Sequence, residues 1–134
     1  MASIGELASI SLADARNLRK NGVKTTEGLL KVAANKKGRA ELAETIGVSS
    51  DQVLLWARRA DMMRITGVGA EYAELLSACG IDSVRALRRR NPAALTTQIF
   101  ELNGSKGLVN RLPTESMVAA WIASAADIEP LVKP

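Results

Sequence analysis

The chain has 134 residues, of which 47% are hydrophobic and 3% aromatic, and its formal net charge is +4. With no histidine and a single cysteine, Cys79, the sequence excludes an internal disulfide, a thiolate metal cage, the common histidine-based zinc sites and histidine-dependent catalytic triads. No run of 18 apolar residues occurs and the first twenty residues lack a signal-peptide segment, so we expect a cytoplasmic protein with no membrane span, metal or cofactor.

The positive charge is unevenly distributed. Residues 1–64 contain 11 Lys and Arg against 7 Asp and Glu, whereas residues 65–134 contain 7 of each. The whole excess of positive charge therefore lies in the first half, and a charge of this size is weak evidence for a nucleic-acid partner.

Abundant Ala and Leu, short β-branched runs and little period-two alternation predict an all-α protein. In the first half, Gly22 and Gly47 have the position of helix-ending glycines, and Ser49 with Gln52 forms a capping-box pattern. Four helices are expected there: residues 11–20, from Thr25 or Thr26 to 34, 37–46 and 49–63.

The second half predicts a similar series. Gly80 ends a helix, Asn91 with Pro92 reads as the cap and first position of another, and Thr114 caps the last. The expected helices are residues 70–79, one capped by Asp82 or Ser83, one from 91, and 114–126.

The two halves look like copies of one helical unit. Gly22 and Gly80 align at an offset of 58 residues, and Trp56 and Trp121 align at an offset of 65, so the second copy carries an insertion, placed around residues 103–113. We therefore expect two pseudo-repeats, residues 1–64 and 65–129, packed as one compact domain and followed by a tail, residues 130–134. Both tryptophans are expected in the core.

The stretch "ITGVGAEYAELLSACGI" (residues 65–81) resembles a helix–hairpin–helix element, with Ile65, Gly67, Val68 and Gly69 in its turn. The first copy, residues 7–23, carries Ser9 and Ser11 in place of both glycines, and so has a degenerate hairpin. The whole pattern is similar to a bacterial family of tandem helix–hairpin–helix proteins with no assigned function.

This resemblance implies binding of the nucleic-acid backbone, because glycines and helix N-terminal amides suit phosphate oxygens. We expect Gly69 at positive φ, whereas Glu71 stands where the family often has lysine and would repel phosphate. The alternative is that the hairpin only sets the angle between two helices. The predicted nucleic-acid-binding residues are Arg64, Gly67, Val68, Gly69, Ala70, Arg88 and Arg89.

The sequence contains further candidate patterns beside the hairpin. Basic clusters lie at residues 85–90, 36–39 and 58–64, each either a backbone track or a solvated surface. Residues 41–59 resemble a helix-turn-helix, but Leu54 and Leu55 favour a core or partner surface over a base-reading one.

No enzyme signature is present, so we expect no catalytic activity. The leading hypothesis is a weak, sequence-independent DNA-backbone-binding module. The alternative is a helical protein-interaction or structural module that binds no nucleic acid.

Overall fold

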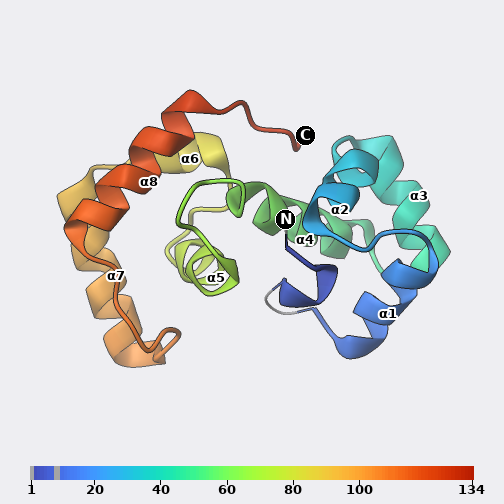
Figure 1. Ribbon diagram of the computed structural model, residues 1–134, viewed down its shortest axis with the longest axis horizontal. Coiled ribbons are helices and arrows are strands. Elements are labelled where there is room, and N and C mark those ends of the chain that lie inside the picture. The colour runs from blue at the N-terminus through green and yellow to red at the C-terminus, as the bar shows by residue number, and fades with distance from the viewer. Residues whose placement is uncertain (1, 8–9) are drawn as a thin grey trace. The chain divides into compact units, whose positions relative to one another are not determined.

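Figure 1 shows the computed structural model of the chain, which describes residues 2–7 and 10–134. Within these residues the ordered elements are helices, and the β pairing is limited to an isolated antiparallel bridge between Ser3 and Thr25. The predicted all-α class is confirmed. The elements are η1 (Ile4–Glu6), α1 (Leu12–Lys20), α2 (Thr26–Ala33), α3 (Lys36–Ile46), α4 (Ser50–Met62), α5 (Ala70–Ala78), α6 (Val84–Arg88), α7 (Pro92–Lys106) and α8 (Glu115–Asp127).

The chain divides into two compact units. Unit 1 comprises residues 1–61 and 131–134, and unit 2 comprises residues 62–130. The polypeptide therefore leaves unit 1 near the end of α4, builds unit 2, and returns to unit 1 at Leu131. The predicted boundary between the two halves falls after residue 64, and residues 130–134 are predicted as a tail.

Side-chain caps explain where most helices begin. In each case a Ser, Thr or Asn oxygen accepts the backbone N–H three residues later, which satisfies one of the orphan donors of a helix start. Between the alternatives left open, Thr25 rather than Thr26 caps α2, and Ser83 rather than Asp82 caps α6. The capping residues are Ser11, Thr25, Asn35, Ser49, Ser83, Asn91 and Thr114. Ser9, the other serine of the degenerate hairpin, lies outside the described residues.

The ends of α1 and α5 have the same local geometry. Both helices have nine residues and stand 58 positions apart, and each is followed by a left-handed glycine, Gly22 with φ +86° or Gly80 with φ +82°. The next residue, Val23 or Ile81, donates its N–H over 2.9 Å to the carbonyl five residues earlier, which is the bond of a Schellman motif. Superposition of the two helix pairs stays a prediction.

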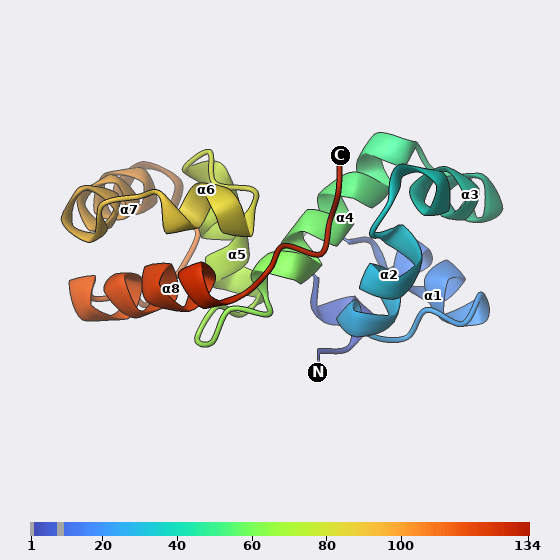
Figure 2. The ribbon, with the colours of Figure 1, turned by 90° about the horizontal axis from the view of Figure 1, so that it is seen from above.

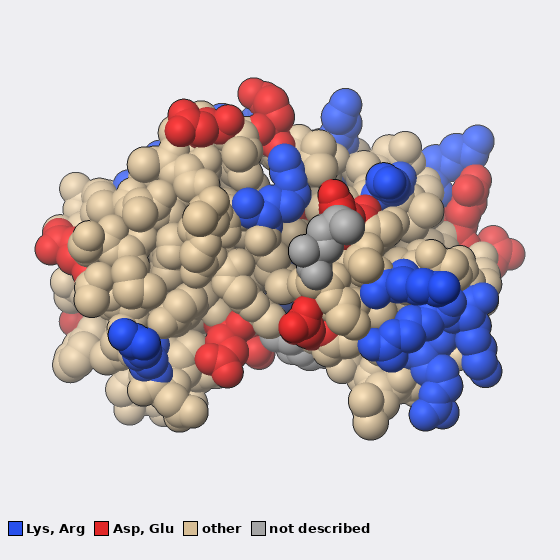
Figure 3. All heavy atoms as spheres, viewed as in Figure 1, with Lys and Arg blue, Asp and Glu red and all other residues tan. Residues whose placement is uncertain are grey.

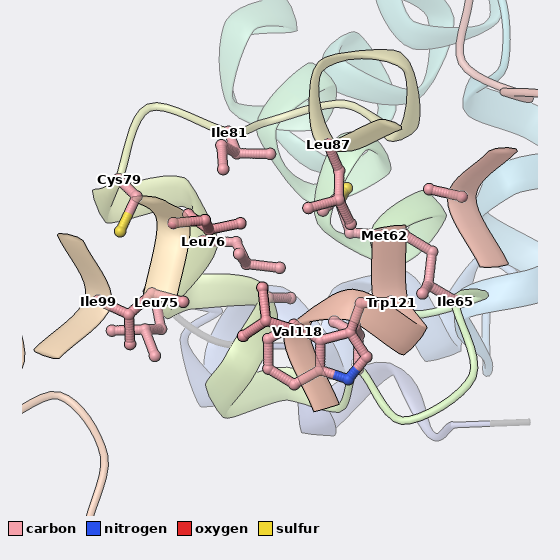
Figure 4. Close-up of a cluster of buried hydrophobic side chains, with 14 of the residues drawn as sticks. Met62, Ile65, Leu75, Leu76, Cys79, Ile81, Leu87, Ile99, Val118 and Trp121 are labelled. Carbon is pink, nitrogen blue, oxygen red and sulfur yellow. The ribbon is translucent and has the colours of Figure 1, made fainter. Parts of the chain in front are cut away.

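Each unit has an aliphatic core built around one tryptophan. Trp56 of α4 is 1% exposed and Trp121 of α8 is 2% exposed, so both tryptophans are core residues as expected. In unit 2, α8 packs against α6 and α7, and α5 packs against α7. Figure 4 shows Trp121 beside aliphatic side chains from α5, α6 and α8. Its ring also lies 5.0 Å, centroid to centroid, from that of Tyr72.

The insertion predicted at residues 103–113 is partly helical. Helix α7 continues to Lys106 and has 15 residues, against 11 in α3, and it ends at the left-handed Gly107. The stretch where the insertion is predicted is therefore divided between the end of α7 and the loop before α8. Asn103 supports the end of α7 by accepting the Val109 N–H on its Oδ1 at 2.9 Å.

Candidate nucleic-acid interface

The segment between α4 and α5 is a double turn with its apolar side chains inside. The Ile65 N–H donates to the Met62 carbonyl over 3.1 Å, and the Val68 N–H donates to the Ile65 carbonyl over 3.0 Å. Ile65 and Val68 are 1% and 4% exposed. Val68, a predicted phosphate ligand, therefore has its amide inside the turn and its side chain in the core.

The two glycines of the turn have different conformations. Gly67 has φ +90°, whereas Gly69 has φ −90° and ψ −172°, an extended conformation that any residue adopts. The expectation of a positive φ at Gly69 was wrong: the left-handed glycine is Gly67, two residues earlier, within the turn from Ile65 to Val68. Gly69 serves instead as the N-cap of α5.

The start of α5 differs from the starts of the other α-helices. Gly69 has no side chain and makes no side-chain cap, and it is exposed, as is Glu71 in the first turn. Ala70 is half-buried. The amides of the first turn lack intrahelical acceptors and concentrate the positive end of the helix dipole, but the Glu71 carboxylate already supplies negative charge beside them.

Two of the predicted arginines hold the end of α8. Arg88 donates from Nε and Nη2 to the Ala125 carbonyl, at 3.1 and 3.0 Å, and from Nη2 to the Ile128 carbonyl at 2.6 Å. Arg64 donates from Nη1 to the Glu129 carbonyl at 3.0 Å. A cation at a helix C-terminus satisfies the last carbonyls, so these guanidinium groups have a structural task. Arg89, one residue past α6, is exposed.

The other predicted basic clusters are also divided. Lys36 and Lys37 are exposed in the first turn of α3, but Arg39 is 4% exposed. Arg58 is exposed on α4, and Arg59 is half-buried. None of these runs presents all its charges on one surface, because consecutive residues of a helix point in different directions.

A denser set of cations lies on α1. Arg16, Arg19 and Lys20 occupy positions i, i+3 and i+4, so they share one face, and Lys24 follows in the next loop. All four are exposed, and Figure 3 shows Lys and Arg side chains gathered over the part of unit 1 where α1 lies. We call these four residues the α1 basic face. The spacing of Arg16, Arg19 and Lys20, in the half that holds the excess charge, is the signal that sequence reasoning missed.

Two side-chain hydrogen bonds are made at the α1 basic face or at the residue that follows α1. Arg19 Nη2 donates to Ser3 Oγ at 3.3 Å, which is a neutral partner. The amide of Asn21, the residue after Lys20, donates to the Asn17 carbonyl at 2.8 Å. The surface therefore offers positive charge, and the Asn21 side chain is hydrogen-bonded to the main chain.

A model of the domain of unknown function DUF4332 matches residues 8–128. The chain belongs to the DUF4332 family. No curated protein and no solved structure matches the chain. The DUF4332 match spans both the turn before α5 and the α1 basic face.

Across residues 2–7 and 10–134, no group of three or more Cys, Asp and Glu side chains is arranged to hold a metal ion. In the same part of the chain, every helix is too short or too polar to cross a bilayer.

Proposed function

We propose that this DUF4332 chain is a binding module that holds nucleic acid weakly, without sequence preference, through the sugar–phosphate backbone. The observation that carries the proposal is the α1 basic face: Arg16, Arg19 and Lys20 share one face of α1, and all three are exposed, as is Lys24, in the unit that holds the excess charge. Lys and Arg contacts to phosphates release condensed counterions, which favours binding at low salt whatever the base sequence.

Lack of sequence preference follows from the chemistry of the same surface. Bases are distinguished by bidentate side chains that enter a groove, typically Arg to guanine and Asn or Gln to adenine. On α1 the nearby amide of Asn21 is bonded to the main chain, and the cations lie along the last two turns of the helix rather than at its leading end. Contacts of this kind position a protein on the backbone and carry no base information.

The turn before α5 is a second contact in this proposal. In this proposal residues 65–81 act as a helix–hairpin–helix element, and its hairpin is the turn that contains the left-handed Gly67. The absence of a side-chain cap at Gly69 favours a phosphate oxygen as acceptor for the first amides of α5. Glu71 weakens this contact by repulsion, which fits a weak rather than a tight binder.

The alternative, a protein-interaction module, is favoured by exposed apolar side chains. Leu12 at the start of α1 is 85% exposed, and Phe100 on α7 is 65% exposed. Large apolar side chains that face solvent are common anchors for protein partners. In this alternative the α1 basic face would select an acidic partner instead of a phosphate backbone.

The experiment is a titration of a random-sequence duplex by fluorescence anisotropy at several salt concentrations. The double variant Arg16→Gln with Lys20→Gln is compared with Lys36→Gln with Lys37→Gln, an equal loss of charge on α3. We expect the α1 pair alone to lower affinity and to flatten the slope of log K against log salt by roughly 0.9 per lost phosphate contact.

Three outcomes separate the hypotheses. Equal effects of the two double variants would show that net charge alone attracts the duplex, without a defined face. No binding by the natural chain even at low salt would overturn the proposal and leave the protein-interaction module. An affinity that depends on the base sequence of the duplex would contradict the absence of base reading.

A further inference from the structure

Two charged side chains are buried among the residues that the structure describes, and both act on the end of the chain. Arg39 is 4% exposed and Asp61 is 3% exposed. Burial of a charge is costly unless hydrogen bonds replace its water shell. Two buried charges on separate helices, α3 and α4, therefore mark the place where they act as a preformed binding site.

The bonds run to residues 131–133, which we call the docked segment. Asp61 Oδ2 accepts the N–H groups of Leu131 and Val132 at 3.0 and 3.4 Å. The Lys133 N–H donates to the Ala34 carbonyl at 2.8 Å, and the Lys133 carbonyl accepts from Arg39 Nη2 at 2.9 Å. Figure 2 shows the end of the chain running along α4.

Arg39 also holds the end of α2, where the Ala34 carbonyl binds the docked segment. Its Nη1 donates to the carbonyls of Ala33 and Ala34 at 3.0 and 3.1 Å, at the point where α2 ends. The guanidinium group thus ties the last carbonyls of α2 to the docked segment. Because the same Ala34 carbonyl also accepts the Lys133 N–H, the acceptor and the donor for the segment are held in one rigid arrangement.

The site binds the main chain of the docked segment rather than its side chains. Leu131 and Lys133 are exposed and Val132 is half-buried, whereas the N–H groups of all three donate hydrogen bonds into unit 1. Pro130 and Pro134 bracket the segment and have no N–H of their own. Lys133 precedes Pro134, and a residue before proline favours extended backbone, so this end of the segment is suited to docking.

We infer that Ala34, Arg39 and Asp61 form a binding site for an extended peptide backbone, and that the docked segment of a second copy occupies it in reciprocal exchange. The docked segment packs in unit 1 but is covalently attached to unit 2, which is the connectivity that exchange between copies requires. A second copy offers the same three N–H groups between the same two prolines. In the monomer the chain's own segment competes at an effective concentration on the order of millimolar.

The test weakens the docking of the chain's own segment without changing Ala34, Arg39 or Asp61. In the full chain, Leu131→Pro with Val132→Pro removes both N–H groups that Asp61 accepts. A fluorescein-labelled peptide of residues 128–134 is then titrated into this variant and into the natural chain, with circular dichroism to establish folding. We expect binding to the variant to be at least tenfold tighter than to the natural chain, because the variant's own segment no longer competes.

A matched pair of variants locates the binding. In the same proline background, Asp61→Asn is expected to weaken binding of the peptide at least tenfold, whereas Asp51→Asn, on the exposed side of the same helix, leaves it unchanged. A peptide that carries both prolines is expected not to bind. Failure of the folded variant to bind the natural peptide, or equal binding after Asp61→Asn, would overturn the inference.

A second measurement uses the natural chain alone and does not depend on the proline variant. The chain is unfolded in urea and refolded at low and at high protein concentration, and its mass is measured by light scattering after gel filtration. Exchange predicts a dimer that forms on refolding at high concentration and is suppressed by excess peptide. A monomer under every refolding condition, or a dimer that the peptide leaves unchanged, would contradict exchange between copies.

Discussion

A Cβ atom added at Gly67 would lie 3.0 Å from Nε1 of Trp121, and the backbone of Gly67 has φ +90°. Figure 4 shows the indole nitrogen of Trp121 facing the loop that follows Ile65. Since Trp121 is 2% exposed and fixed in the core, the ring cannot retreat from a side chain at this position.

The same substitution at the two glycines of the turn is therefore expected to have opposite effects. Gly67→Ser should lower the free energy of unfolding by about 1–3 kcal/mol, because it combines a strained φ with a close contact. Gly69→Ser should raise it by up to about 1 kcal/mol, because the N-cap backbone suits serine and nothing lies within 4 Å of an added Cβ. Urea denaturation of both variants measures the difference, and equal losses would refute this assignment of the turn.

Glu71→Lys tests whether the start of α5 touches nucleic acid. The change converts a repulsive carboxylate into an attractive ammonium group, so affinity for a random-sequence duplex should rise and the salt slope should steepen by roughly 0.9. Glu115→Lys is the control, because it makes the same charge change in the first turn of α8, where Thr114 caps the helix. An equal gain from both variants would assign the effect to net charge.

Substitutions of Arg88 and Arg89 are predicted to differ in their effect on the free energy of unfolding rather than on nucleic-acid binding. Arg88→Ala removes three hydrogen bonds to the end of α8 and should cost about 1.5–3 kcal/mol, the range for bonds from a charged donor. Arg89→Ala, at an exposed neighbouring position, should stay within about 0.5 kcal/mol of the natural chain. Thermal and urea unfolding measure both, and a similar loss from Arg89→Ala would show that the α8 carbonyls are not the cause.

Cys79 gives the stability of the fold a pH dependence. Burial raises the pKa of its thiol above 9.0, and the positive charge of Arg90 opposes this in part. Above the pKa of the unfolded chain, the unfolded state has released the thiol proton while the folded state retains it, so stability falls as pH rises. Between pH 7 and 10 the natural chain should lose more stability than Cys79→Ala, in which the thiol is absent. Parallel curves would mean that Cys79 does not titrate differently on folding.

Local chemistry made the helices predictable. Ser11, Thr114 and the pair Asn91 and Pro92 mark helix starts through bonds or constraints that span three residues, so the sequence alone contains both partners. The left-handed glycines after α1 and α5 are local for the same reason. The course of the double turn before α5 was less accessible, because either glycine of "GVG" permits positive φ and the residue that packs against Gly67, Trp121, is distant in the sequence.

The candidate site was harder to predict because its charges depend on distant partners. Arg88 lies in a conspicuous arginine run, yet the carbonyls that bind it are 37 and 40 residues away. Arg39 and Asp61 resemble surface charges in sequence, and their partners in the docked segment are 94 and 70 residues away. By contrast, the α1 basic face needs only helical spacing, and it was available from the sequence.

The return of the chain to unit 1 at Leu131 also sets an order for its synthesis. Residues 131–133 are translated after every residue of unit 2, so unit 1 lacks a segment that packs in it until the whole of unit 2 has been synthesised. The docking of three amides on Asp61 and Ala34 therefore cannot precede the synthesis of unit 2. A chain cut before Leu131 should hold all of unit 2 and an incomplete unit 1, although unit 1 is the first to be translated.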